Sequence, residues 1–184
     1  METFLTSTLL VAIAEIGDKT QLLAIVLAAR FKRPVPIILG VLIATLANHA
    51  FAATLGALAG DLLESAWLRY AIAAGFVAMA LWALIPDKEE DAPVRAGGSA
   101  FLTTLVAFFL VEMGDKTQIA TAALAARFDS IALVTAGTTL GMMLANIPAI
   151  YLGEAATRVL PLKLMRWIAA ALFAGLGVWT LLAA

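Results

Sequence analysis

Six apolar runs, each about as long as a bilayer-spanning helix, occupy almost the whole sequence. They are Phe4–Ala29, Val35–Ala59, Trp67–Ile85, Ala100–Ala126, Ile131–Ala156 and Leu162–Ala183. A helix needs about 20 mainly apolar residues to cross the hydrocarbon core. The composition agrees, because 63% of the residues are hydrophobic and 14% are charged, whereas soluble domains average about 45–50% and about 25%. The sequence therefore predicts an all-α integral membrane protein of six transmembrane helices. The expected partner of its outer surface is the lipid bilayer.

The two halves of the chain repeat one another at an offset of 97 residues. The offset relates Gly40 to Gly137, Arg69 to Arg166 and Trp82 to Trp179. We predict a first three-helix repeat over residues 1–85, an acidic linker over 86–99 and a second three-helix repeat over 100–184. Because each repeat has an odd number of helices, the second copy enters the membrane from the opposite side. This arrangement is an inverted-topology repeat, which is typical of secondary transporters.

The distribution of basic residues predicts the orientation in the membrane. The joints after the first, third and fifth runs, with the adjoining helix ends, carry eight lysines and arginines, whereas the opposite side carries Arg69 and Arg127. Short cytoplasmic loops are enriched in lysine and arginine. We therefore expect the central linker in the cytoplasm and both termini outside. Residues 1–3 contain no basic residue, so we expect no cleaved signal peptide.

A polar motif interrupts the first and fourth runs near their centres. Residues 15–21 read Glu-Ile-Gly-Asp-Lys-Thr-Gln, and residues 112–118 read Glu-Met-Gly-Asp-Lys-Thr-Gln. A charged side chain at the bilayer centre costs about 2.5–3.5 kcal/mol on insertion scales. On a continuous helix the two acids of each copy share one face, and the glycine permits either close helix contact or local unwinding. We expect the four carboxylates to meet at the midplane as metal ligands: Glu15, Asp18, Glu112 and Asp115.

The charge and chemistry of these residues indicate a hard divalent cation. Four carboxylates and two lysines leave a net charge of about −2, which one such ion neutralises. Carboxylate, amide and hydroxyl oxygens suit Ca²⁺, Mn²⁺ or Mg²⁺. The residues expected to support the site are Lys19, Thr20, Gln21, Asn48, Lys116, Thr117, Gln118 and Asn146. Crowded carboxylates also take up protons, so the sequence favours exchange of the cation for H⁺.

Several alternatives remain open at this stage. Glu15 with Lys19, and Glu112 with Lys116, are i, i+4 pairs that a non-transporting membrane scaffold could use. A passive cation channel could use the same acids, although an inverted repeat favours a transporter. His49 has no counterpart after Asn146, so we interpret it as a packing residue, with proton handling as the alternative.

Other classes of protein are not expected. The chain has no cysteine and a single histidine, which argues against an enzyme with a thiol nucleophile, a zinc–thiolate site or an iron–sulfur cluster. We expect no prosthetic group and no nucleic-acid partner. The sequence leaves homo-oligomerisation open.

The doubled Glu-x-Gly-Asp-Lys-Thr motif, with each copy in the first of three membrane helices, resembles the signature of the Gdt-type divalent-cation/proton antiporters. That family includes Golgi calcium–manganese transporters and small bacterial manganese exporters of the MneA type. The resemblance covers the whole chain and implies a metal site at Glu15, Asp18, Glu112 and Asp115. It implies Mn²⁺ as the transported substrate, with Ca²⁺ second, and H⁺ as the coupling ion. It also implies export across a bacterial cytoplasmic (inner) membrane.

Overall fold

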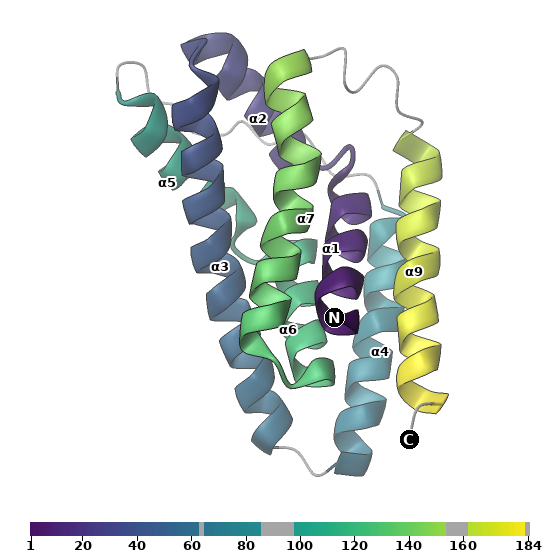
Figure 1. Cartoon of the computed structure of the whole chain (residues 1–184). Coiled ribbons are helices and arrows are strands. Elements are labelled where there is room, and N and C mark those ends of the chain that lie inside the picture. Colours follow the sequence, from purple (N-terminus) through teal and green to yellow (C-terminus); the bar gives the residue numbers. More distant parts are fainter. Residues whose placement is uncertain (63–64, 86–97, 154–161, 183–184) are drawn as a thin grey trace.

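The computed structural model describes residues 1–62, 65–85, 98–153 and 162–182, and over these ranges every regular element is an α-helix. The helices are α1 (Glu2–Glu15), α2 (Lys19–Phe31), α3 (Pro34–Leu62), α4 (Ser65–Ala83), α5 (Ala100–Glu112), α6 (Lys116–Phe128), α7 (Ile131–Leu152) and α9 (Leu162–Leu182) (Figure 1). The prediction of an all-α protein is confirmed. Apart from its last two residues, the predicted linker lies outside the described residues, as does most of the joint that precedes α9.

Among the described residues, three helices are long and apolar enough to cross a membrane. Their apolar segments are Pro34–Gly60, Ile131–Leu152 and Lys163–Leu182, and shorter apolar helices cover Arg69–Ala83 and Ala100–Glu112. The protein is apolar on the outside and partly polar within. Leu39, Ile43 and Leu46 of α3 are each more than two-fifths exposed, whereas Thr45 and Asn48 of the same helix are buried. Such a surface suits contact with lipid, and the inner hydroxyl and amide groups can join helices to one another.

Two of the predicted runs do not form single helices. The run Phe4–Ala29 is divided into α1 and α2, and the run Ala100–Ala126 is divided into α5 and α6. Both breaks fall within the polar motif. Of the two possibilities that the motif glycines left open, close helix contact and local unwinding, the structure shows local unwinding. The reason is the backbone of Gly17 and Gly114, which have φ angles of 81° and 79°, outside the right-handed helical region.

The two halves of the chain pack against each other through two equivalent sets of helix contacts. Helix α3 packs on α5 and α6, and α7 packs on α1 and α2. Gly40 of α3 lies so close to α5 that a methyl group on it would come within 2.9 Å of the carbonyl oxygen of Phe101. In the same way, a methyl group on Gly137 of α7 would come within 2.6 Å of the carbonyl oxygen of Phe4 in α1. Both pairs of equivalent residues differ by the offset of 97. Small residues thus bring each repeat into close contact with the other, and α3 and α7 run in opposite directions through the molecule (Figure 1).

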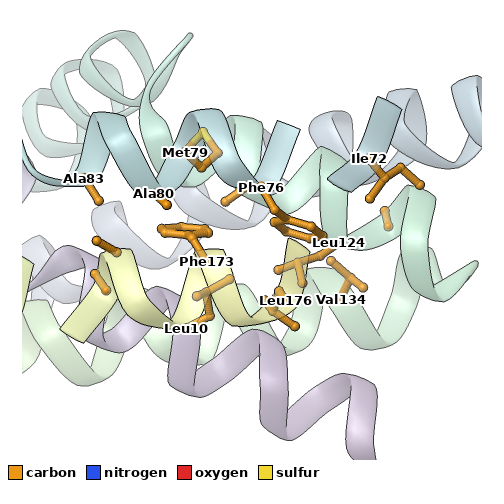
Figure 2. Close-up of a cluster of buried hydrophobic side chains, with 14 of the residues drawn as sticks. Leu10, Ile72, Phe76, Met79, Ala80, Ala83, Leu124, Val134, Phe173 and Leu176 are labelled. Carbon is orange, nitrogen blue, oxygen red and sulfur yellow. The ribbon is translucent and has the colours of Figure 1, made fainter. Parts of the chain in front are cut away.

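Helices α4 and α9 pack side by side and close one flank of the bundle. Their shared core contains Phe76 of α4 and Phe173 of α9, which are equivalent in the repeat and almost fully buried (Figure 2). Leu10 of α1 and Leu124 of α6 belong to the same cluster. Because lipid tails are as apolar as these side chains, close packing rather than transfer from water stabilises such an interface. The cluster fixes α4 and α9 against the two broken helices.

Candidate functional site

Each motif forms a tight turn between two half-helices. Ile16 has φ −64° and ψ 113°, Gly17 has φ 81°, and the amide nitrogen of Asp18 donates to the carbonyl oxygen of Glu15 at 3.0 Å. These angles describe a type II β-turn, whose third position needs a positive φ and therefore favours glycine. The second copy repeats the geometry, with φ −67° and ψ 117° at Met113, φ 79° at Gly114 and 3.1 Å between the amide nitrogen of Asp115 and the carbonyl oxygen of Glu112.

The threonine and glutamine of each motif stabilise its turn. The Thr20 hydroxyl donates to Glu15 Oε2 at 2.5 Å, and the amide nitrogen of Gly17 donates to Gln21 Oε1 at 2.9 Å. The second copy makes the same two bonds, from the Thr117 hydroxyl to Glu112 Oε1 and from the amide nitrogen of Gly114 to Gln118 Oε1. These four residues were predicted to support the site. Their observed contacts orient the glutamates and pair backbone groups that the helix breaks would otherwise leave unsatisfied.

Three of the four predicted metal ligands lie together where the two turns meet. Glu15, Glu112 and Asp115 each offer an oxygen within 4.8 Å of the others, and their side chains are at most 3% exposed. In the part of the chain that the structure describes, Glu15 Oε1, Glu112 Oε2 and Asp115 Oδ2 are buried without a hydrogen-bond partner. Buried polar atoms normally have partners, because desolvation without compensation is unfavourable. Such a cluster of carboxylate oxygens can bind a hard cation.

Asp18 lies outside this group of three and has a different neighbour. It is the residue before α2, as Asp115 is before α6, so the prediction that Glu15 and Asp18 share one helix face was wrong. Asp18 Oδ1 lies 4.0 Å from Lys116 Nζ, and Asp115 Oδ1 lies 3.3 Å from Lys19 Nζ. Both ion pairs join one repeat to the other. The lysines thus contact the aspartate of the other motif rather than the glutamate four residues before them, which was the pairing open to a non-transporting scaffold, because each first half-helix ends at the glutamate.

The buried polar residues of α3 and α7 surround the two turns. Asn48 Nδ2 donates to the carbonyl oxygen of Phe109 at 3.1 Å, and Gln118 Nε2 lies 3.4 Å from Asn48 Oδ1. Gln21 Nε2 donates to the carbonyl oxygen of Ala145 at 3.1 Å, and Ala145 is equivalent to Asn48 at the offset of 97. The side chains of the two glutamines therefore reach equivalent positions on the two helices. Asn48 supports the second turn through Gln118.

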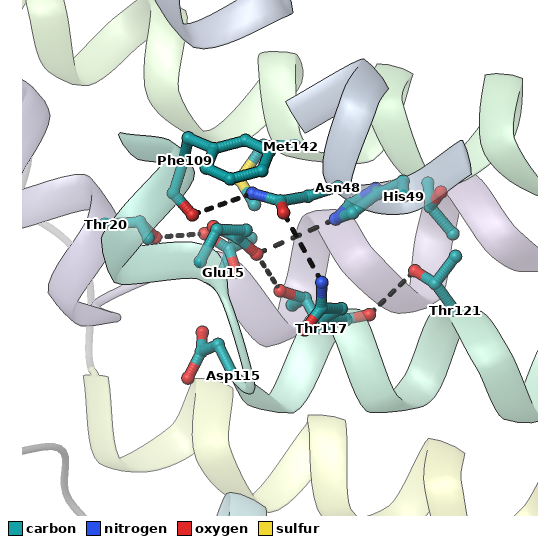
Figure 3. Close-up of polar contacts among 12 residues, drawn as sticks. Glu15, Thr20, Asn48, His49, Phe109, Asp115, Thr117, Thr121 and Met142 are labelled. Atoms are coloured by element: carbon teal, nitrogen blue, oxygen red, sulfur yellow. Dashed lines mark hydrogen bonds and ion pairs between the residues drawn. The ribbon is translucent and has the colours of Figure 1, made fainter. Parts of the chain in front are cut away.

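His49 faces the carboxylates, which sequence reasoning underestimated. Its Nε2 lies 3.7 Å from Glu112 Oε1, and both side chains are buried (Figure 3). The helices begin at Pro34 and Ile131, again 97 apart, so the residue equivalent to His49 is Asn146. Asn146 Nδ2 donates to the carbonyl oxygen of Met142 at 3.0 Å. Matching the strings Leu46–Asn48 and Leu144–Asn146 letter by letter introduces a slip of one residue and pairs Asn48 with Asn146. The offset of 97, applied without that slip, pairs His49 with Asn146 and was the signal that could have identified this position.

A small cavity reaches Asp18 beside the end of α4 and the first half of α9. Asp18 and Lys116 both line it, so it adjoins one of the two ion pairs between the repeats. Lys116 Nζ also donates to the carbonyl oxygen of Ile85, just beyond α4, at 3.3 Å. The complete lining is Ala14, Ile16, Gly17, Asp18, Ala83, Lys116, Arg166, Ala169 and Phe173. The cavity therefore borders Asp18 on the side of the bundle where α4 ends.

Comparison with known proteins identifies the relatives of the chain. A family model described as "Divalent cation/proton antiporter GDT1" matches residues 3–91 and 100–184. A Vibrio cholerae protein named "Putative manganese exporter" is 47% identical over 164 residues, which cover 89% of this chain and 82% of that protein. A GDT1-like protein of Synechocystis is 29% identical over 176 residues, with 82% of each chain covered. No solved structure matches the chain.

Proposed function

This chain belongs to the GDT1 family of divalent cation/proton antiporters, and on that basis we propose that it exports Mn²⁺ from the cytoplasm in exchange for protons. Its relatives are named as transporters and not as enzymes. The choice of Mn²⁺ over Ca²⁺ rests on the relative named as a manganese exporter, which is similar over most of both chains.

The observation that carries the proposal is the meeting of Glu15, Glu112 and Asp115 between the two repeats. Lys19 compensates the charge of Asp115, and the other two carboxylates cannot both remain ionised at this distance without a further compensating charge. A divalent cation provides that charge when it binds, and protons provide it when the cation leaves. Thr20 and Thr117 hold the two glutamates in place. The same oxygens thus serve both ions in turn, which couples their movements.

The two lysines of the motifs provide a way to open one side at a time. Lys19 pairs with Asp115, and Lys116 pairs with Asp18, so each pair joins the two repeats. We propose that each pair loosens when the cation reaches its aspartate from the corresponding side of the membrane. Asp18 is then the first ligand on the side of the cavity. It completes the site as the fourth carboxylate.

The reciprocal packing of α3 on α5 and of α7 on α1 supports the proposed inverted repeat. Six membrane crossings follow if each broken pair of half-helices crosses once. In the proposed orientation both termini lie outside a bacterial inner membrane and the linker lies in the cytoplasm. The cavity beside the end of α4 then faces the cytoplasm, where Mn²⁺ is loaded. Because the chain has no cysteine, Ala92→Cys is a unique labelling site, and labelling of intact cells by an impermeant maleimide would contradict this orientation.

The exchange itself is tested in proteoliposomes that enclose a pH-sensitive dye. When Mn²⁺ is added outside, an exchanger carries it inward and protons outward, so the lumen becomes alkaline. We expect this signal from the wild-type chain and not from Glu112→Gln or Asp18→Asn. Glu2→Gln is the matched control, because Glu2 is an exposed acid at the start of α1. Mn²⁺ entry without a proton signal would indicate a channel, and no movement of either ion would contradict the proposal.

A further inference from the structure

We propose that His49 is a nitrogen ligand of the transported cation and gives the site a preference for transition-metal ions over Ca²⁺ and Mg²⁺. This inference rests on the proposed function, because it assumes that the carboxylate cluster binds the cation. It adds one ligand that lies outside both copies of the motif and has no chemical equivalent in the other repeat.

The position of His49 fits a shared ion. Its Nε2 lies 3.7 Å from Glu112 Oε1, and Glu112 is one of the three clustered carboxylates. Two atoms bound to one ion at about 2.0–2.3 Å can lie at most about 4.6 Å apart. His49 lies outside the group of three whose oxygens are all within 4.8 Å of one another, so an ion can bridge His49 and Glu112 as they stand, and the imidazole must move toward the other two carboxylates for the ion to bind all of them. Figure 3 shows the imidazole pointing from α3 toward the carboxylates.

A role in packing alone leaves the polarity of His49 unexplained. The residue is fully buried, and within the described ranges neither of its ring nitrogens has a hydrogen-bond partner. Buried polar atoms nearly always have one. Neutral imidazole is the commonest metal ligand in proteins, so a bound cation supplies the partner that the protein does not. An apolar residue would fill the same space without the desolvation penalty.

The imidazole changes which ion the site prefers. Ca²⁺ and Mg²⁺ take oxygen ligands, whereas imidazole suits first-row transition metals. The equivalent residue of the other repeat, Asn146, carries an amide whose Nδ2 already donates to the carbonyl oxygen of Met142. The site therefore combines several carboxylate oxygens with one nitrogen from one side. Mn²⁺ accepts this mixture more readily than Ca²⁺ does.

The single histidine of the chain makes the ligand directly observable. We would purify the full chain through a tag that contains no histidine, load it with Mn²⁺ and record pulsed electron paramagnetic resonance spectra. With ¹⁵N-labelled histidine, we expect the modulation from a directly bound ¹⁴N to be replaced by that of ¹⁵N. Stoichiometric Mn²⁺ binding without a histidine coupling would overturn this inference and leave the proposed function standing. Absence of Mn²⁺ binding would overturn both.

The preference is tested with His49→Asn, which introduces the residue of the equivalent position. We expect its Mn²⁺ affinity to fall by at least about tenfold, because loss of even a hydrogen-bond partner of a metal ligand costs about 10–100-fold, and its Ca²⁺ affinity to change less than about twofold, because Ca²⁺ takes oxygen ligands. Thr54→Val serves as the control, because Thr54 is an exposed residue of the same helix whose hydroxyl donates only to the carbonyl oxygen of Ala50. Equal losses for both ions, or no loss for Mn²⁺, would overturn the inference. The labelled wild-type protein decides the question if His49→Asn does not fold.

Discussion

Replacing Gly114 by alanine tests whether the turn of the second motif is required. Gly114 has φ 79°, and a methyl group added there meets no atom within 4 Å. The substitution therefore has no steric component, and its penalty is that of a left-handed backbone, about 1–2 kcal/mol for alanine. The variant can avoid this strain only by extending α5 through the motif, which would separate Glu112 from the Thr117 hydroxyl that holds it.

We expect Gly114→Ala to lose about 1–2 kcal/mol of unfolding free energy, measured by reversible denaturation in mixed micelles with tryptophan fluorescence as the signal. Its Mn²⁺ affinity should fall by up to about tenfold, because about 1.4 kcal/mol separates two states by that factor. Gly114→Asn should lose less on both measures, because asparagine tolerates a positive φ better than alanine does.

The matched control is Gly75→Ala within α4. A methyl group there also meets nothing within 4 Å, and Gly75 has no positive φ. Alanine favours a helix interior over glycine by about 1 kcal/mol, so this variant should be stabilised while transport stays unchanged. Wild-type stability and Mn²⁺ affinity in Gly114→Ala would refute the reasoning, because the turn would then be dispensable.

Two further substitutions probe the packing and the site. Gly56→Ala would place a methyl group against the backbone of Ala122 in α6, so α3 must move away. We expect the variant to lose about 2–3 kcal/mol of unfolding free energy in the same denaturation assay. An unfolding free energy equal to that of Gly75→Ala would contradict the contact. Thr117→Val removes the hydroxyl donor that holds Glu112 in place, a loss of about 1–3 kcal/mol, so the Mn²⁺ affinity measured by calorimetry should fall by about 5- to 150-fold. Thr121→Val, which loses only a bond to the carbonyl oxygen of Thr117, should bind Mn²⁺ normally.

The sequence predicted the helical class and the pairing of the two motifs, but it misled about the backbone of the motif itself. An apolar run of the right length is consistent with one continuous helix whether or not its centre is unwound. The opposing signal lay in the motif: glycine at the third position of a turn, followed by Asp18, a residue type that favours the position before a helix. That local pattern is decisive in the structure, because Gly17 adopts a positive φ and α2 begins immediately after Asp18.

The position of His49 could not be obtained from matching letters. Pairing the two Leu-Ala-Asn strings introduces a slip of one residue, and one residue turns a helix by about 100°. Helices α3 and α7 begin 97 residues apart and repeat the contacts of Gly40 and Gly137 at the same offset. The two motif glutamines reach Asn48 and Ala145, which are again 97 apart, so no slip occurs up to His49. The side chain that occupies the place of Asn146 is therefore His49. The constant offset of 97 carries this information in the sequence, and the contacts between the helices confirm that it holds at this position.

The difference between the two ion pairs leads to a prediction about the opposite state of the transporter. Lys116 lies 4.0 Å from Asp18 and also donates to the carbonyl oxygen of Ile85, whereas Lys19 lies 3.3 Å from Asp115. At the offset of 97, Ile85 corresponds to Leu182 at the end of α9. If the repeats exchange conformations, Lys19 should reach the carbonyl oxygen of Leu182 when Lys116 leaves that of Ile85.

Spin labels at two pairs of introduced cysteines can follow this exchange, because the chain has no cysteine of its own. One pair joins Met113 to Ile85, and the equivalent pair joins Ile16 to Leu182. The protein is reconstituted into closed lipid vesicles, and the Mn²⁺ gradient across the membrane is then reversed. The distance between the labels at Met113 and Ile85 should lengthen while the distance between the labels at Ile16 and Leu182 shortens, because each repeat adopts the conformation that the other gives up. Distances that lengthen together would instead indicate a pore that opens on both sides, and two unchanged distances would mean that the ion pairs are static links between the repeats.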